Sequence, residues 1–215
     1  MSRPTHILDQ VGEKARSYFS AQDSARELGL RLSRESIRFS ANAIRAVHRG
    51  EFDLAGDLIA SCRGNIDEMN RTLADHPELL HGGFVHNGQK EFAEACITLA
   101  LVSGDRVPEP DDIGVSYAAY LNGLGEAAGE LRRHLLDTLR EGHMARCEEI
   151  LGAMDDIYSL LVTIDYHDAL TGGLKRTTDM VRGVLERTRG DLTISLRQKH
   201  LEQKLQDFTR ELGSR

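Results

Sequence analysis

The chain is poor in the residues that build turn-rich or covalently braced folds. It contains no tryptophan, four prolines and three cysteines among 215 residues, whereas 40% of its residues are hydrophobic and 28% are charged. Little proline combined with this much charge favours long helices over a turn-rich β-sandwich. A chain of this length can bury one substantial core, so we expect a single domain over residues 1–215.

Two further absences concern the membrane and the compartment. The longest uncharged apolar run, residues 95–102, is far shorter than the roughly 20 residues that a membrane-spanning helix requires. The first residues, MSRPTHILDQ, lack the apolar core and the cleavage site of a signal peptide. We therefore expect a cytoplasmic protein with no membrane partner.

The cysteines and histidines offer no clear site. Cys62, Cys96 and Cys147 are odd in number and widely spaced, which predicts reduced, buried thiols in place of a disulfide framework or a zinc site. His81 and His86 match no defined zinc spacing, and we interpret them as surface residues of a flexible loop.

Other catalytic signatures are also missing. His167 and Asp168 are adjacent, so their side chains would point in different directions on a helix. The chain has no P-loop, GxGxxG, HExxH or GxSxG motif. Candidate functional residues must therefore be sought among the other charged side chains.

Helical periodicity dominates the sequence, and no alternating strand pattern is evident. Six helices are expected, with a loosening of the first near Gly29 and an interruption of the last near Gly190. Their ranges are 5–49, 52–74, 88–103, 112–140, 143–167 and 174–212. The glycine-containing segments HRGEFD and REGHM predict tight αα-hairpins. The expected fold is an all-α antiparallel bundle of about six to seven helices.

Two pairs of glutamates stand at helical spacings. Glu91 and Glu94 are three residues apart, and Glu126 and Glu130 are four apart, so the members of each pair share a helix face. Glycines and alanines around the second pair would allow another helix to approach closely. If the two helices are antiparallel neighbours, the pairs can face each other. Four carboxylates in one pocket require cations, and hard oxygen ligands suit Mg²⁺ or Mn²⁺.

A simpler interpretation of these glutamates stays open. Glu91 and Glu94 fall near a helix N-terminus, where acidic residues are favoured by the helix dipole. Glu126 and Glu130 could be ordinary surface residues beside the arginines that follow them.

An arginine stripe offers a basic site on an acidic chain. The net charge is −7, so the surface as a whole should repel polyanions unless it carries a locally basic region. Arg34, Arg38, Arg45 and Arg49 recur at spacings of four and seven beside an apolar line. Guanidinium groups bind phosphate well, but a solvent-exposed face paired with nearby glutamates would have the same pattern.

Together these features resemble the translin family, and most closely translin-associated factor X and its archaeal relatives. The segments LRLSRESIRFSANAIRAVHRGE, QKEFAEA and YLNGLGEAAGELRR carry the resemblance, which spans roughly residues 29–191. It implies an all-α fold assembled into a hollow homo-oligomer, typically an octamer, that holds RNA inside.

The resemblance also implies a site. In the factor-X branch, carboxylates of the second and third segments form a metal-dependent ribonuclease centre. Glu91 and Glu94 match the first of these motifs, whereas Glu126 replaces an aspartate and Glu130 matches a glutamate. We therefore expect an Mg²⁺- or Mn²⁺-dependent endoribonuclease acting on single-stranded RNA, with the arginine stripe positioning the RNA backbone.

Two other functions are consistent with the sequence. The first is a translin-like protein that binds single-stranded RNA or single-stranded DNA without cutting it. The second is a helical-bundle protein with a redox di-metal centre, although neither glutamate pair contains the Glu-x-x-His motif of that class.

Overall fold

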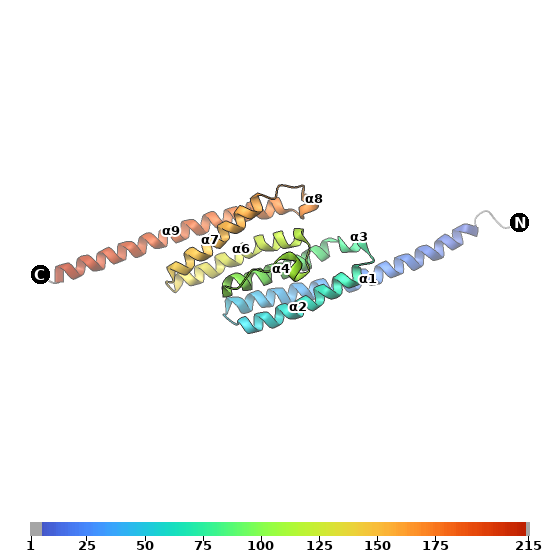
Figure 1. The fold of residues 1–215 in the computed structure, drawn as a ribbon, viewed down its shortest axis with the longest axis horizontal. Helices are drawn as coiled ribbons and strands as arrows, with labels where there is room; N and C mark the ends of the chain where they lie inside the picture. Colours follow the sequence, from blue (N-terminus) through green and yellow to red (C-terminus); the bar gives the residue numbers. More distant parts are fainter. Residues whose placement is uncertain (1–5, 214–215) are drawn as a thin grey trace.

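The structure, a computed structural model, describes residues 6–213 and contains only helices over that range (Figure 1). Six long helices form the molecule, and they are α1 (His6–His48), α2 (Phe52–Leu73), α4 (Gly83–Ser103), α6 (Tyr117–Arg140), α7 (Met144–Val162) and α9 (Leu174–Gly213). Three short helices lie in the connections, namely α3 (Pro77–Leu80), α5 (Pro110–Ile113) and α8 (Asp168–Thr171). The predicted all-α class is confirmed.

Several predicted boundaries differ from those observed. The expected start at residue 5 lies outside the described residues, and α1 and α9 continue without interruption through Gly29 and Gly190. The predicted helix 112–140 is divided, because Gly114 takes a φ of 66° and Ser116 then caps α6 by accepting a hydrogen bond from the backbone N–H of Ala119. The helix α4 begins at Gly83, five residues before the predicted start, and α7 ends at Val162 rather than at residue 167.

Both predicted hairpins are present and antiparallel. Gly50 joins α1 to α2 with a φ of 73°, and Gly142 joins α6 to α7 with a φ of 84°. Both values lie in the left-handed region, which glycine adopts without the steric cost that a Cβ atom would impose. These two turns therefore fix the chain reversals that the sequence predicted.

The helices α4 and α6, by contrast, run in parallel (Figure 1). The backbone N–H of Ser116, at the start of α6, donates to the side-chain oxygen of Gln89, and Gly123 lies against the backbone of α4 between Lys90 and Glu94. The two helices are therefore not the antiparallel neighbours that the sequence left open. The connection over residues 104–116, which includes α5, returns the chain to the end of the bundle at which α4 begins.

The centre of the bundle is α4, which packs against α1, α2 and α6. Its side chains at Phe92, Ala95 and Ile97 are fully buried, because neighbours cover this helix on several sides. All three cysteines are buried free thiols, as predicted. Most of the uninterrupted apolar run, residues 95–102, is thus buried in the bundle.

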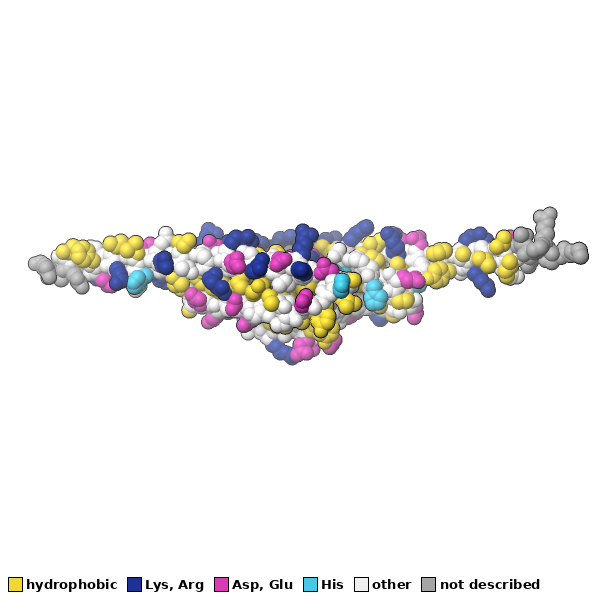
Figure 2. Space-filling model, turned by 90° about the horizontal axis from the view of Figure 1, so that it is seen from above, with side chains coloured by type: hydrophobic (Ala, Val, Ile, Leu, Met, Phe, Trp, Pro, Cys, Tyr) yellow, Lys and Arg dark blue, Asp and Glu magenta, His cyan; other side chains and the backbone are white. Residues whose placement is uncertain are grey.

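The first part of α1 and the last part of α9 project from opposite ends of the body (Figure 1). Figure 2 shows hydrophobic side chains on both projections. The exposed large residues there are Ile7, Leu8, Val11, Tyr18 and Phe19 on α1, and Ile194, Leu196, Leu201, Leu205, Phe208 and Leu212 on α9. Within residues 6–213, no helix is both long enough and apolar enough to cross a membrane.

Candidate functional site

The site begins with a close approach of two helices. A methyl group added at Gly123 of α6 would come to 2.6 Å from the backbone oxygen of Lys90 and 2.9 Å from the Cβ of Ala93. The two backbones are therefore nearly in contact, as the small residues of this segment predicted. Gly125 similarly admits Thr177 of α9, whereas Gly129 faces open space.

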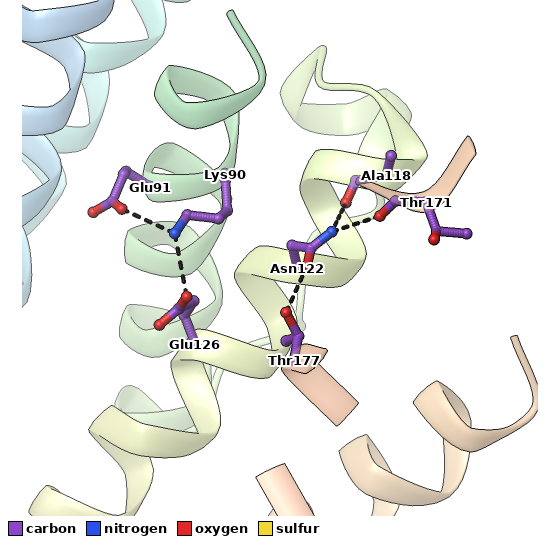
Figure 3. A network of polar contacts seen from close by, with 7 residues as sticks. All are labelled: Lys90, Glu91, Ala118, Asn122, Glu126, Thr171 and Thr177. Carbon is purple, nitrogen blue, oxygen red and sulfur yellow. Dashed lines mark hydrogen bonds and ion pairs between the residues drawn. The ribbon is translucent and has the colours of Figure 1, made fainter. Parts of the chain in front are cut away.

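Lys90 joins the two helices through their carboxylates (Figure 3). Its Nζ lies 3.3 Å from an Oε atom of Glu91 on the same helix and 3.2 Å from an Oε atom of Glu126 on α6. Burial alone would lower the pKa of Lys90, but the charges and hydrogen bonds of these two glutamates outweigh it, and the pKa lies above its usual value. The lysine is therefore held as a cation between two acidic side chains.

Glu94 is the most deeply buried acid of the group, with 8% of the residue exposed. Burial raises its pKa to about 8, and the charges of Glu91, Glu126 and Glu130 contribute in the same direction. Among the described residues, its carboxyl has neither a hydrogen-bond donor nor an ion-pair partner. A buried carboxyl without such partners is costly when ionised, so the free protein favours its neutral form at pH 7.

Glu130 is bound by a residue from a third helix. Nε2 of His48, in the last turn of α1, lies 2.5 Å from a carboxylate oxygen of Glu130. The hydrogen bond with His48 lowers the pKa of Glu130 against the opposing effect of burial. The histidine side chain is only 4% exposed, and its Nδ1 is buried without a partner.

Glu91, Glu126 and Glu130 all lie near enough for their charges to act on Glu94, and we call these four residues the acidic cluster. Over residues 6–213, no three His, Cys, Asp or Glu side chains converge in a metal-ligating arrangement. The donors nevertheless suit Mg²⁺ or Mn²⁺, because they are hard oxygen atoms and carry more negative charge than Lys90 alone can balance. Their role as metal ligands stays a prediction.

The predicted arginine stripe lies on the exposed side of α1. Arg34, Arg38 and Arg45 are solvent-exposed, and none has an ion-pair partner among the described residues. Arg49 instead pairs with Glu51, at 2.6 Å between charged atoms, so the solvated-face interpretation applies to this residue. Three of the four predicted arginines are therefore available to bind an anion.

The arginine stripe adjoins the acidic cluster. His48 follows Arg45 by three residues, so helical geometry places it about one turn from Arg45 on α1. Its contact with Glu130 therefore links the end of α1 that carries Arg45 to the acidic cluster. His48 and Lys90 are the two cluster residues that sequence reasoning missed. The spacing of His48 from the arginines was the only signal for the first.

The predictions for the other histidines have different outcomes. His81 is exposed after α3, but His86 belongs to α4, so the loop interpretation is wrong for His86. Both line an open groove of about 970 Å³ between α3, α4, α6 and α8. His167 and Asp168 are exposed at the start of α8.

Fold and site together define an all-helical protein with a partly buried acidic cluster beside a basic helix face. No protein-family profile matches the chain. An uncharacterised protein of Methanocaldococcus jannaschii is 31% identical over 191 residues, which cover 88% of this chain and 84% of that protein.

Solved structures extend the comparison. AfC3PO, solved alone and in complex with duplex RNA, has TM-scores of 0.78 and 0.79 at 29% identity, covering 85% of this chain and 95% of AfC3PO. The structure of apo-NeC3PO, at 19% identity and a TM-score of 0.72, covers 91% of this chain and 99% of NeC3PO and supports the fold alone. These solved structures, which are similar to this chain over most of its length, are thus proteins of the translin/C3PO family.

Proposed function

We propose that the protein is a metal-dependent endoribonuclease that hydrolyses phosphodiester bonds of single-stranded RNA inside a homo-oligomeric shell. The observation that carries this proposal is the acidic cluster. Glu94 is buried among three other carboxylates, and such a group becomes tolerable as an anion only when a cation joins it. The duplex RNA bound by AfC3PO supports RNA as the ligand class.

Mg²⁺ or Mn²⁺ is the cofactor that this proposal requires. Glu91, Glu94, Glu126 and Glu130 would hold it, and when bound it would lower the pKa of a coordinated water and offset charge on the phosphate. Two residues of the chain determine the state of these carboxylates. His48 holds the Glu130 carboxylate in place, and Glu94 would have to be deprotonated to serve as a ligand.

The exposed arginines would hold the RNA backbone. Arg34, Arg38 and Arg45 present guanidinium groups that match phosphate oxygens, and phosphate contacts carry no sequence information. Sequence preference should therefore be weak. Because each phosphate contact releases counter-ions, Arg34→Ala and Arg38→Ala should each flatten the slope of log affinity against log salt by roughly 0.7 on single-stranded RNA. Unchanged slopes would remove these arginines from the interface.

Assembly is a separable part of the proposal. We expect a homo-octamer that encloses the RNA, in which the apolar side chains on the projecting ends of α1 and α9 are covered by other copies. Light scattering should then give a mass several times that of one 23.9 kDa chain. A mass near that of a single chain would contradict the shell.

The direct test is cleavage of labelled RNA with and without Mg²⁺. Glu91→Gln and Glu126→Gln should each lower the rate on the order of a hundredfold or more, because part of the charge that binds the cation is lost. Glu186→Gln, an exposed acid on α9, is the matched control and should cleave like the wild type. Single-stranded and duplex substrates should be compared. Equal cleavage by all four proteins would remove the acidic cluster from catalysis.

One observation favours a second function. Lys90 already bridges Glu91 and Glu126, which is also the arrangement expected of a structural ion-pair network in a non-catalytic protein that binds single-stranded RNA or DNA. Salt-sensitive binding to both nucleic acids with no product at any Mg²⁺ or Mn²⁺ concentration would select that function.

A further inference from the structure

Lys90 holds a place in the acidic cluster that a metal ion would also need. Its ammonium lies within 3.3 Å of carboxylate oxygens from both α4 and α6, and its side chain is 21% exposed. The close approach at Gly123 keeps the two carboxylates near enough for one cation to reach both. Figure 3 shows the ammonium between the two acids.

A second observation shows that this arrangement is incomplete. Glu94 lies in the same cluster, only 8% of the residue is exposed, and its carboxyl has no hydrogen-bond or ion-pair partner among residues 6–213. The Lys90 ammonium therefore pairs with two of the four carboxylates, and His48 pairs with a third. A divalent cation carries twice the charge of Lys90 and accepts more oxygen ligands.

We propose that Lys90 is a tethered counter-ion, which holds the acidic cluster together without metal and is displaced when a divalent cation binds. The proposal rests on the proposed function, since it concerns the same carboxylates. The flexible stem of lysine allows its head group to move towards solvent without a change of backbone. Displacement costs the two ion pairs, so Lys90 raises the metal concentration at which the site fills.

The first test measures metal binding itself. Free Mn²⁺ is followed by its paramagnetic resonance signal during titration of the wild type, Lys90→Met and Lys90→Arg. Lys90→Met keeps the apolar stem but removes the charge, so it should bind Mn²⁺ about tenfold more tightly. Lys90→Arg keeps the charge and should bind no more tightly than the wild type. Lys199→Met, on the exposed end of α9, controls for the change in net charge.

The second test needs no substitution and so does not depend on how the variants fold. Lys90 and Lys199 are acetylated in the wild-type protein with and without saturating Mg²⁺, and mass spectrometry follows each site. Displacement should expose the Lys90 amine and speed its acetylation severalfold, while Lys199 reacts at the same rate in both conditions. An unchanged or slower reaction at Lys90 would overturn the proposal, as would equal Mn²⁺ affinities of Lys90→Met and the wild type.

These outcomes separate the two proposals. If the wild type cleaves RNA with Mg²⁺ but Lys90→Met binds Mn²⁺ no more tightly, the counter-ion role fails and the nuclease stands. If Lys90→Met binds Mn²⁺ more tightly and neither protein cleaves RNA, the nuclease fails and the counter-ion role stands. If neither protein binds Mn²⁺, both are wrong.

Discussion

Two polar networks flank α6, and they differ in charge and in completeness (Figure 3). On one side, the Asn122 amide donates to the backbone oxygens of Ala118 and Thr171, each at 2.8 Å, and accepts from the Thr177 hydroxyl at 2.6 Å. This network is neutral, and Asn122 is almost fully buried. On the other side lies the acidic cluster, with four carboxylates and one lysine.

The contrast indicates different tasks. The Asn122 network joins α6 to α8 and α9 and satisfies three of the four hydrogen-bonding positions of the amide, which is what a structural connection requires. The acidic cluster leaves the buried Glu94 unpartnered and its charges unbalanced. An unbalanced group kept inside a stable fold is characteristic of a binding or catalytic site. Three substitutions test this difference between the two networks.

The largest effect is expected from Glu94→Gln in metal-free protein at fixed concentration. The folded state holds the Glu94 proton up to about pH 8, whereas the unfolded state releases it near pH 4.5. The unfolding free energy should therefore fall as pH rises between these values, by on the order of 3 kcal/mol from pH 5 to pH 8, and level off above.

Glu94→Gln should remove most of that decline and be the more stable protein at pH 8. Urea unfolding of both proteins at several pH values, with a chelator present, measures how the unfolding free energy declines. Parallel pH profiles for the two proteins would show that Glu94 does not carry a raised pKa, and the contrast between the two networks would lose its strongest element.

The next effect in size is expected from Asn122→Ala on the neutral side. Removing the amide leaves the Thr171 carbonyl and the Thr177 hydroxyl without their partner, at a cost of about 2 kcal/mol of unfolding free energy. Mn²⁺ affinity of the folded protein should not change. Chemical denaturation and metal titration of the same sample test both points. If Asn122→Ala weakened Mn²⁺ binding and left the unfolding free energy unchanged, the structural role of Asn122 would be wrong.

The smallest effect is expected from Thr177→Val, which keeps the side-chain shape and removes one hydrogen bond to Asn122. We expect a loss of about 1 kcal/mol in denaturant unfolding. Thr178→Val is the matched control, because the Thr178 hydroxyl donates only to the backbone oxygen of Leu174 within its own helix. Equal losses in the two variants would mean that the link between α6 and α9 adds nothing beyond an ordinary helix.

Much of the fold could be predicted because its signals are local. Helical periodicity identified all six long helices, and the glycines of HRGEFD and REGHM identified the two hairpins. The orientation of α6 relative to α4 had no local signal. Either direction buries the same apolar faces, and the choice depends on how residues 104–116 are anchored, with Arg63 and Asn70 of α2 donating to backbone oxygens there.

The site was predictable in part for the same reason. Spacing along each helix identified the four glutamates, since their pairing is a property of one helix at a time. Lys90 looks like a surface charge in the sequence and is enclosed only because α6 approaches it at Gly123. His48 meets Glu130 across 82 residues of chain, a contact that only the tertiary fold creates.

The approach at Gly123 has one more consequence. The width of the acidic cluster is set by a residue with no side chain, because the added carbon of an alanine would press on the backbone of α4 and drive the helices apart. Evolution could therefore retune the spacing of the carboxylates, and with it the size of cation they accept, by changing a position that carries no chemistry. Among homologous chains, the identity of this residue should vary together with metal preference.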